Sequence, residues 1–304
     1  GAKVELLCNI GNAEETKYAK DVGAEGIGLF RTEFLFLHRQ AAPSEDAQFI
    51  VYKQVLSAMD PHPVTIRTLD AGGDKPIPYV YLADEVNPFL GVRAIRLCLQ
   101  EQTLFRTQLR ALLRASIYGN LQIMFPMVAV IEELRQAKAI LASVREELLA
   151  EGCKVAEAIP IGMMIETPAA ALSAHFFAQE CDFFSIGTND LVQYTNAADR
   201  GSQGLVYLQD PLSPAVLSLI ALTIIQGHKF GIKVGICGEM AGMPEAIPLL
   251  VGLGIDELSM APALLPKAKS VIRDLDSEKA ALIGQDVQKL RTVREIRDYL
   301  KTNL

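Results

Sequence analysis

The sequence predicts an α/β fold, a closed (β/α)8 TIM barrel with extra C-terminal helices, and two observations lead to this prediction. Eight short apolar segments alternate with segments of helical periodicity along the 304 residues, which is typical of βα units around a parallel sheet. Polar residues also follow the carboxyl end of most apolar segments, where barrels of this kind carry their active sites. An open doubly wound sheet is the alternative, but eight units favour a closed barrel.

The expected strands are runs of about four to eight mostly apolar residues. In chain order they are Val4–Ile10, Gly26–Phe30, Val64–Thr68, Leu121–Pro126, Ile159–Glu166, Asp182–Ile186, Lys233–Cys237 and Glu257–Met260. The segments between them carry apolar residues at helical spacing, which predicts helices. Examples are Ala13–Val22, Glu45–Met59, Thr103–Ser116, Ile131–Ala150 and Pro214–Phe230. Two further helical segments, Lys267–Arg273 and Thr292–Leu300, follow the last strand as a C-terminal cap.

The composition excludes several classes of protein. The chain is 50% hydrophobic and 21% charged, which excludes a disordered or collagen-like sequence. A net charge of −7 argues against a broad nucleic-acid-binding face. No apolar run reaches the roughly 20 residues of a membrane helix, so we expect neither nucleic acid nor a membrane as a partner.

The cysteines and the ends of the chain bear on its location and extent. The five cysteines lack CxxC spacing, so we expect no disulfide framework or structural zinc, and with no signal peptide in view we expect a cytoplasmic location. There is no internal repeat and no long linker, which favours one domain over residues 1–304. The abrupt start at Gly1 suggests a fragment of a longer protein.

Basic side chains follow several of the expected strands. Arg31 and Arg67 come directly after apolar segments, and Arg93, Arg200 and Lys75 lie in the segments that connect strands to helices. Guanidinium groups match phosphate and carboxylate groups in a two-pronged geometry. Several of them around one cavity therefore indicate a site for a small polyanion. The alternative is that each arginine pairs with a local carboxylate at the rim of the barrel.

Two carboxylates end adjacent strands, and we expect them to be neighbours. Glu166 follows the fifth strand and Asp190 follows the sixth. Two ionised carboxylates about 4 Å apart repel by roughly 4 kcal/mol at an effective dielectric constant of 20. With no histidine or cysteine beside them, the pair suits Mg²⁺ or Mn²⁺ that shares ligands with a bound phosphate. The alternative is neutralisation by nearby arginine or lysine.

A cysteine between glycines follows the seventh strand. Cys237, in the segment GICGEMAG, shares the face on which the arginines are expected, where a thiol can donate a proton or attack as a thiolate. A small buried apolar role is the alternative. The four histidines, His38, His62, His175 and His228, lie away from the strand ends. We interpret them as surface or packing residues.

Six motifs occur in one order: GIGLFRTEFLF, TIRTLDAGGDK, EVNPFLGVRAIR, GMMIETPAA, FFSIGTNDLVQYT and GICGEMAG. The series closely resembles the phosphoenolpyruvate-binding domain of the enzyme I family of the bacterial phosphotransferase system, from about Val4 to about Arg273. The resemblance implies a barrel that binds phosphoenolpyruvate and Mg²⁺ and forms a homodimer. It assigns Arg31, Arg67, Lys75, Arg93, Asn189 and Arg200 to the substrate, Glu166 and Asp190 to Mg²⁺, and a proton-donor role to Cys237.

The resemblance also implies a partner that this chain lacks. In the family, the histidine that takes the phosphoryl group lies in a separate N-terminal domain, and through it the group reaches a histidine-containing phosphocarrier protein. No motif of that domain occurs in these 304 residues, so we expect the chain to bind phosphoenolpyruvate but not to complete the transfer alone. Two alternatives remain: the phosphoenolpyruvate/pyruvate domain of a dikinase or synthase, and a non-catalytic phosphoenolpyruvate-sensing dimerisation module.

Overall fold

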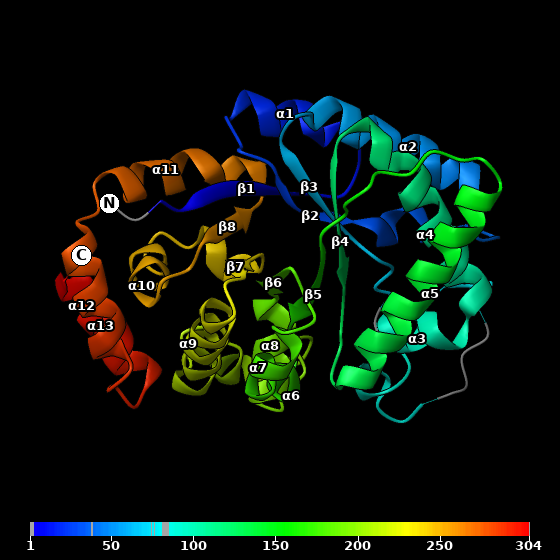
Figure 1. Ribbon diagram of the computed structural model, residues 1–304. Helices are drawn as coiled ribbons and strands as arrows, with labels where there is room; N and C mark the ends of the chain where they lie inside the picture. Colours follow the sequence, from blue (N-terminus) through cyan, green and yellow to red (C-terminus); the bar gives the residue numbers. More distant parts are fainter. Residues whose placement is uncertain (1–2, 38, 74, 76, 81–84, 304) are drawn as a thin grey trace.

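Eight parallel strands close into a barrel in the part of the chain that the computed structural model describes, residues 3–37, 39–73, 75, 77–80 and 85–303 (Figure 1). The strands follow one another around the barrel in chain order, so the predicted (β/α)8 fold is confirmed. They are β1 (Glu5–Ile10), β2 (Ile27–Arg31), β3 (Pro63–Arg67), β4 (Asn120–Phe125), β5 (Ile161–Ile165), β6 (Phe183–Ile186), β7 (Lys233–Ile236) and β8 (Glu257–Met260).

Helices connect the strands and surround the barrel (Figure 1). The α-helices are α1 (Glu15–Asp21), α2 (Glu45–Met59), α3 (Ile95–Gln100), α4 (Gln102–Ala115), α5 (Ile131–Ala150), α6 (Pro168–Leu172), α7 (Ala174–Phe177), α8 (Thr188–Thr195), α9 (Pro214–Lys229), α10 (Ile247–Leu253), α11 (Leu265–Arg273), α12 (Ser277–Val287) and α13 (Val293–Asn303). Short 3-10 helices are η1 (Thr32–Leu35), η2 (Pro88–Leu90), η3 (Ser116–Tyr118), η4 (Gln203–Leu208), η5 (Glu239–Gly242) and η6 (Pro262–Leu264).

Several helices begin where the sequence supplies a side chain that caps them. The side chain of Ser44 accepts a hydrogen bond from the Ala47 amide at the start of α2, and that of Thr167 does the same for Ala170 in α6. Asp276 caps α12. Such a side chain satisfies a backbone N–H that has no partner within the helix, which fixes the point where each connection turns into a helix.

The hydrophobic core lies mainly between the strands and the surrounding helices, and the barrel interior is filled separately. The interior cluster consists of Leu29, Met124, Met164, Phe183 and Cys237. The ring of Phe183 lies so close to Gly162 on β5 that a Cβ there would stand 2.5 Å from it. Apolar side chains therefore fill the interior below Cys237, which lies at its polar, carboxyl-terminal end.

The C-terminal helices pack beside α10, and α12 was not among the helices expected from the sequence (Figure 1). The contact between α10 and α12 is close because it is made at two glycines. A Cβ at Gly252 would lie 1.9 Å from the carbonyl oxygen of Ala280, and one at Gly284 would lie 2.6 Å from the backbone of Gly252. In the described residues, the helices are all too short or too polar to span a membrane.

Candidate active site

A cavity of about 390 Å³ opens at the carboxyl ends of the strands, and most of the residues singled out in the sequence line it. These are Arg31, Arg67, Lys75, Glu166, Asn189, Asp190, Arg200 and Cys237. Arg31 and Arg67 are the last residues of β2 and β3, whereas Glu166 and Cys237 directly follow β5 and β7. The parallel barrel thus brings side chains far apart in the sequence to one face.

Arg67 lies at the floor of this cavity and is held by two acidic side chains. Its Nη2 is 2.8 Å from Glu33 Oε1 and 3.1 Å from Asp70 Oδ2. Lys75 Nζ lies 3.0 Å from the same oxygen of Glu33 and 3.3 Å from the same oxygen of Asp70. Burial alone would raise the pKa of Asp70, but Arg67, Lys75 and Arg93 outweigh it and hold that pKa well below its usual range. Asp70 therefore stays ionised in the folded protein.

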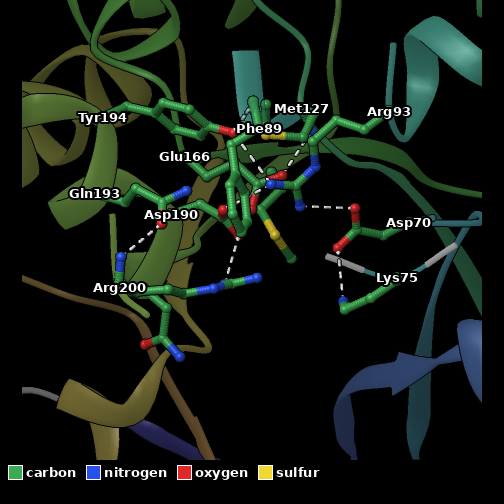
Figure 2. Close-up of polar contacts among 12 residues, drawn as sticks. Asp70, Lys75, Phe89, Arg93, Met127, Glu166, Asp190, Gln193, Tyr194 and Arg200 are labelled. Atoms are coloured by element: carbon green, nitrogen blue, oxygen red, sulfur yellow. Dashed lines mark hydrogen bonds and ion pairs between the residues drawn. The ribbon is translucent and has the colours of Figure 1, made fainter. Parts of the chain in front are cut away.

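Arg93 is not among the residues that line the cavity, but it contacts two residues that do, Asp70 and Asp190. Its Nη2 is 2.9 Å from Asp70 Oδ1, and its Nη1 is 3.0 Å from Asp190 Oδ1 and 3.1 Å from the Tyr194 hydroxyl (Figure 2). The side chain is fully buried. Arg93 is therefore engaged with protein carboxylates, and it fixes the positions of Asp70 and Asp190 relative to each other.

Glu166 is a buried carboxyl in an environment that favours its neutral form. Its Oε1 accepts a hydrogen bond of 2.6 Å from the Met127 amide. Burial, together with the charges of Asp190 and Asp70, raises the pKa of Glu166 to about 8 against the opposing effect of Arg67 and Arg93. At neutral pH this carboxyl keeps its proton unless a cation neutralises it.

The donor set of Glu166 and Asp190 fits a hard divalent cation only if other ligands complete the shell. In the part of the chain that is described, no group of three or more His, Cys, Asp or Glu side chains is arranged to hold a metal ion. Mg²⁺ prefers oxygen ligands and usually binds through one or two carboxylates, with water and substrate phosphate completing the shell. Two carboxylates on the cavity wall, one of them with a raised pKa, match that pattern.

Cys237 is a buried thiol that lies on the cavity wall. Its Sγ is 3.6 Å from the carbonyl oxygen of Ile186, and its side chain is almost completely shielded from solvent. Burial raises the pKa of this thiol, and the Ser185 hydroxyl and the Arg67 charge only partly oppose the rise. The thiol is therefore protonated at neutral pH, so it can give up a proton more readily than it can attack as a thiolate.

The remaining predicted substrate-binding side chains of the cavity, Arg200, Arg31 and Asn189, differ in their surroundings. Arg200 Nη1 is 3.7 Å from Asp190 Oδ2, and its guanidinium lies 5.5 Å from the centroid of the Phe89 ring (Figure 2). Arg31 makes no ion pair with any carboxylate among the described residues. Asn189 forms hydrogen bonds with Glu239 through both side-chain groups, at 3.3 and 3.2 Å. Of the arginines that line the cavity, Arg31 is therefore the one without an ion pair to a carboxylate of the described residues.

The backbone is strained at three points around this cavity. Ala94, Met127 and Ala197 have φ values of 52°, 58° and 50°, in the left-handed region that side chains other than glycine disfavour. Ala94 follows Arg93, Met127 donates to Glu166, and Ala197 lies in the loop that carries Arg200. Such strain persists only where the surrounding structure imposes it, and here it coincides with the charged residues of the site.

Three residues of the site were not predicted from the sequence. Glu33, Asp70 and Tyr194 were not among the predicted site residues, although Glu33 and Asp70 lie in the polar clusters after β2 and β3. None of the described histidines lines the cavity; these are His62, His175 and His228. His38 lies outside the described residues.

The fold and the site define a (β/α)8 barrel whose charged cavity lies at the carboxyl ends of its strands, and a comparison with known families assigns the chain. Residues 1–277 match the family described as "PEP-utilising enzyme, PEP-binding domain", and the chain belongs to this family. Among its relatives, the phosphoenolpyruvate-protein phosphotransferase of Bacillus sp. (strain S) is 55% identical over 301 residues, which cover 99% of this chain and 52% of that protein. The protein of the same name from Bacillus subtilis (strain 168) is 51% identical over 301 residues, 99% of this chain and 53% of its own length.

The chain spans about half the length of the curated relatives it matches. Solved structures of low sequence identity share its fold. A citrate lyase from Burkholderia xenovorans LB400 has a TM-score of 0.57 at 14% identity, covering 100% of this chain and 92% of its own. The Haloferax volcanii malate synthase in complex with magnesium and glyoxylate has a TM-score of 0.56 at 13% identity, covering 90% and 75%. At this identity the likeness concerns the barrel alone.

Proposed function

We propose that this chain binds phosphoenolpyruvate together with Mg²⁺ and supports transfer of the phosphoryl group to a histidine of a separate N-terminal domain, with release of pyruvate. From that histidine the group passes to a histidine-containing phosphocarrier protein, and the chain pairs with a second copy as a homodimer. One observation carries the proposal: a single cavity holds cationic side chains, two carboxylates suited to Mg²⁺ and a protonated thiol. The name shared by the relatives supports it.

In this proposal the arginines and Asn189 hold the anion. Arg31 makes no ion pair with a carboxylate of the described residues, so its charge is available for a phosphate or carboxylate group of the ligand. Arg67 is partly offset by Glu33 and Asp70, so it contributes less net charge but a fixed guanidinium. Charge-assisted hydrogen bonds contribute roughly 1.5–3 kcal/mol each, so two or three suffice for a small anion.

Glu166 and Asp190 would hold the metal ion in this site. When bound, Mg²⁺ would offset the negative charge of the phosphoryl oxygens, which is the main need of phosphoryl transfer. Arg93 then serves to hold Asp190 in place through the 3.0 Å contact to Oδ1. The Met127 amide does the same for Glu166.

Cys237 would supply the proton that completes the reaction. As the histidine forms its bond to phosphorus, the bond between phosphorus and the enol oxygen breaks and leaves the enolate of pyruvate. The Cys237 thiol then gives its proton to the methylene carbon and becomes a thiolate, which takes a proton back from solvent. Burial keeps the thiol protonated at neutral pH, as this role requires.

Titration calorimetry of phosphoenolpyruvate with and without Mg²⁺ tests the binding. We expect Mg²⁺-dependent binding that Arg31→Met weakens by about tenfold or more, without loss of stability because Arg31 makes no ion pair with the residues that the structure describes. Arg294→Met is the matched control, since its side chain is 92% exposed. Unchanged binding by the Arg31 variant would refute the assignment.

The two alternatives give different results in the full-length protein. A dikinase or synthase would form or consume phosphoenolpyruvate only with a nucleotide. A sensing module would bind phosphoenolpyruvate and change its assembly, but it would yield no pyruvate with any histidine domain. The protonated Cys237 on the cavity wall favours the phosphotransferase over the sensing module, because binding alone does not need a proton donor.

A further inference from the structure

The pairing between β7 and β8 stops just before the site, and an amide from a third strand takes its place. The two strands pair at Gly235 with Glu257 and at Ile236 with Leu258. The next residues are Cys237 on one side and Ser259 on the other. The side chain of Asn9, on β1, donates to the carbonyl oxygens of both, at 2.8 Å to Cys237 and 3.2 Å to Ser259.

Three strands hold the Asn9 amide in this orientation. Ser259 Oγ donates a hydrogen bond of 2.6 Å to Asn9 Oδ1, so both ends of the amide are engaged. The register between β1 and β2 shifts between Cys8 and Asn9, and the shift skips Gly28. A Cβ at Gly28 would lie 2.4 Å from Ser259 Oγ, so only glycine leaves room for this hydroxyl. Asparagine is depleted in strands, and here its amide is placed by a register shift, a glycine and a serine.

The other side of Cys237 is fixed by β6. The Cys237 amide donates to the Ile186 carbonyl at 3.0 Å, and the thiol lies 3.6 Å from the same oxygen. The backbone of Cys237 is therefore held at its N–H by β6 and at its carbonyl by Asn9. Asn9 itself does not line the cavity, so any effect on the reaction passes through Cys237.

We infer that Asn9 is a positioning residue for Cys237. The side-chain amide of Asn9 fixes the position of the Cys237 thiol at the carboxyl-terminal end of the barrel. The inference rests on the proposed function, in which that thiol protonates the enolate. A displacement of about 1 Å at a reacting group can cost on the order of a hundredfold in rate. Asn9→Asp keeps the shape of the side chain but replaces the donating NH₂ by an oxygen that faces two carbonyl oxygens.

The test is a double-mutant cycle in the full-length protein with its histidine domain. We expect Asn9→Asp to slow pyruvate formation by about tenfold to a hundredfold, with the phosphoenolpyruvate affinity in calorimetry changed by less than about twofold. In a Cys237→Ala background, Asn9→Asp should slow the reaction no further, because the group it positions is gone. Asn303→Asp is the control, since that amide also donates to a carbonyl, at 2.8 Å, but lies in the last helix.

Each outcome decides the inference. An equal slowing by Asn9→Asp with and without the thiol, or no slowing in the native background, would overturn it. If Asn9→Asp does not fold, Ser259→Ala is tested in the same cycle, since it frees one end of the amide and keeps both donated bonds. If the unmodified protein neither binds phosphoenolpyruvate nor releases pyruvate, the proposed function is wrong. If pyruvate release depends on Cys237 but is not slowed by Asn9→Asp, only the positioning role of Asn9 is wrong.

Discussion

Replacing Arg93 with methionine should destabilise the folded protein by about 3–5 kcal/mol, the usual cost of removing one partner of a buried ion pair. The guanidinium is fully buried and contacts Asp70 at 2.9 Å and Asp190 at 3.0 Å. Methionine fills much of the same volume, so the loss is mainly one of charge. Both carboxylates would remain buried, and among the described residues only Arg67, Lys75 and Arg200 would still form ion pairs with them.

Urea denaturation followed by circular dichroism measures the loss, and a thermal scan gives a second measure. For a chain of this size, each kcal/mol shifts the melting temperature by about 2–4 °C, so a shift of roughly 6–20 °C is expected. Arg110→Met is the matched control: Arg110 also has acidic partners, Glu45, Glu147 and Glu151, but its side chain is only partly buried and remains in contact with solvent. Its replacement should cost less than about 1 kcal/mol.

A double-mutant cycle separates the loss of the ion pair from a loss of packing. In the Arg93→Met background, Asp190→Asn removes an uncompensated charge, and the double variant should be more stable than the sum of the two single changes by about 0.5–3 kcal/mol. Additive effects would show that Arg93 acts through packing. The interpretation that Arg93 neutralises the buried charges of Asp70 and Asp190 would then be wrong.

Three further results follow from the same structure. Cys237→Ala should leave phosphoenolpyruvate affinity intact but slow pyruvate release by about 10²–10⁴-fold; an unchanged rate removes its role as acid. Mg²⁺ affinity should rise with pH up to about 8, because below that value the ion must displace the proton of Glu166. Titration calorimetry should show this rise, and Glu166→Gln should abolish it. Gly252→Ala should cost about 1–3 kcal/mol in urea denaturation, since its Cβ would lie 1.9 Å from the Ala280 oxygen, whereas Gly204→Ala, with open space around it, should be neutral.

The sequence predicted the elements that have a strong local pattern. The helix expected over Ile131–Ala150 has those bounds in the structure, and the strand expected at Leu121–Pro126 lies at Asn120–Phe125. Short helices that start directly after a strand were missed: the Thr188–Thr195 helix begins in the polar segment interpreted as a strand end. A helix of eight residues gives too few turns for its periodicity to stand out from the flanking strand.

The convergence of the site could be predicted because a parallel barrel places all carboxyl ends of its strands on one face. The ion pairs that the arginines of the site form with particular carboxylates could not be predicted. Arg93 and Asp190 are 97 residues apart, and Arg67 and Glu33 are 34 apart. Which carboxylate meets which guanidinium depends on tertiary distances below about 4 Å, and no spacing in the sequence encodes them. The choice between an anion and local carboxylates as partners for the arginines was therefore left open.

The structure answers that question differently for different arginines, and this bears on how the ligand binds. Arg93 is compensated by protein carboxylates and Arg67 is partly offset by them, so they attract an anion less strongly than Arg31, which has no such partner among the described residues. Glu166, with its raised pKa, is neutral at pH 7 until a cation arrives. A divalent ion would leave the cavity with excess positive charge, which a multiply charged anion then offsets. Metal and anion should therefore bind with positive cooperativity, because each reduces the electrostatic cost of the other.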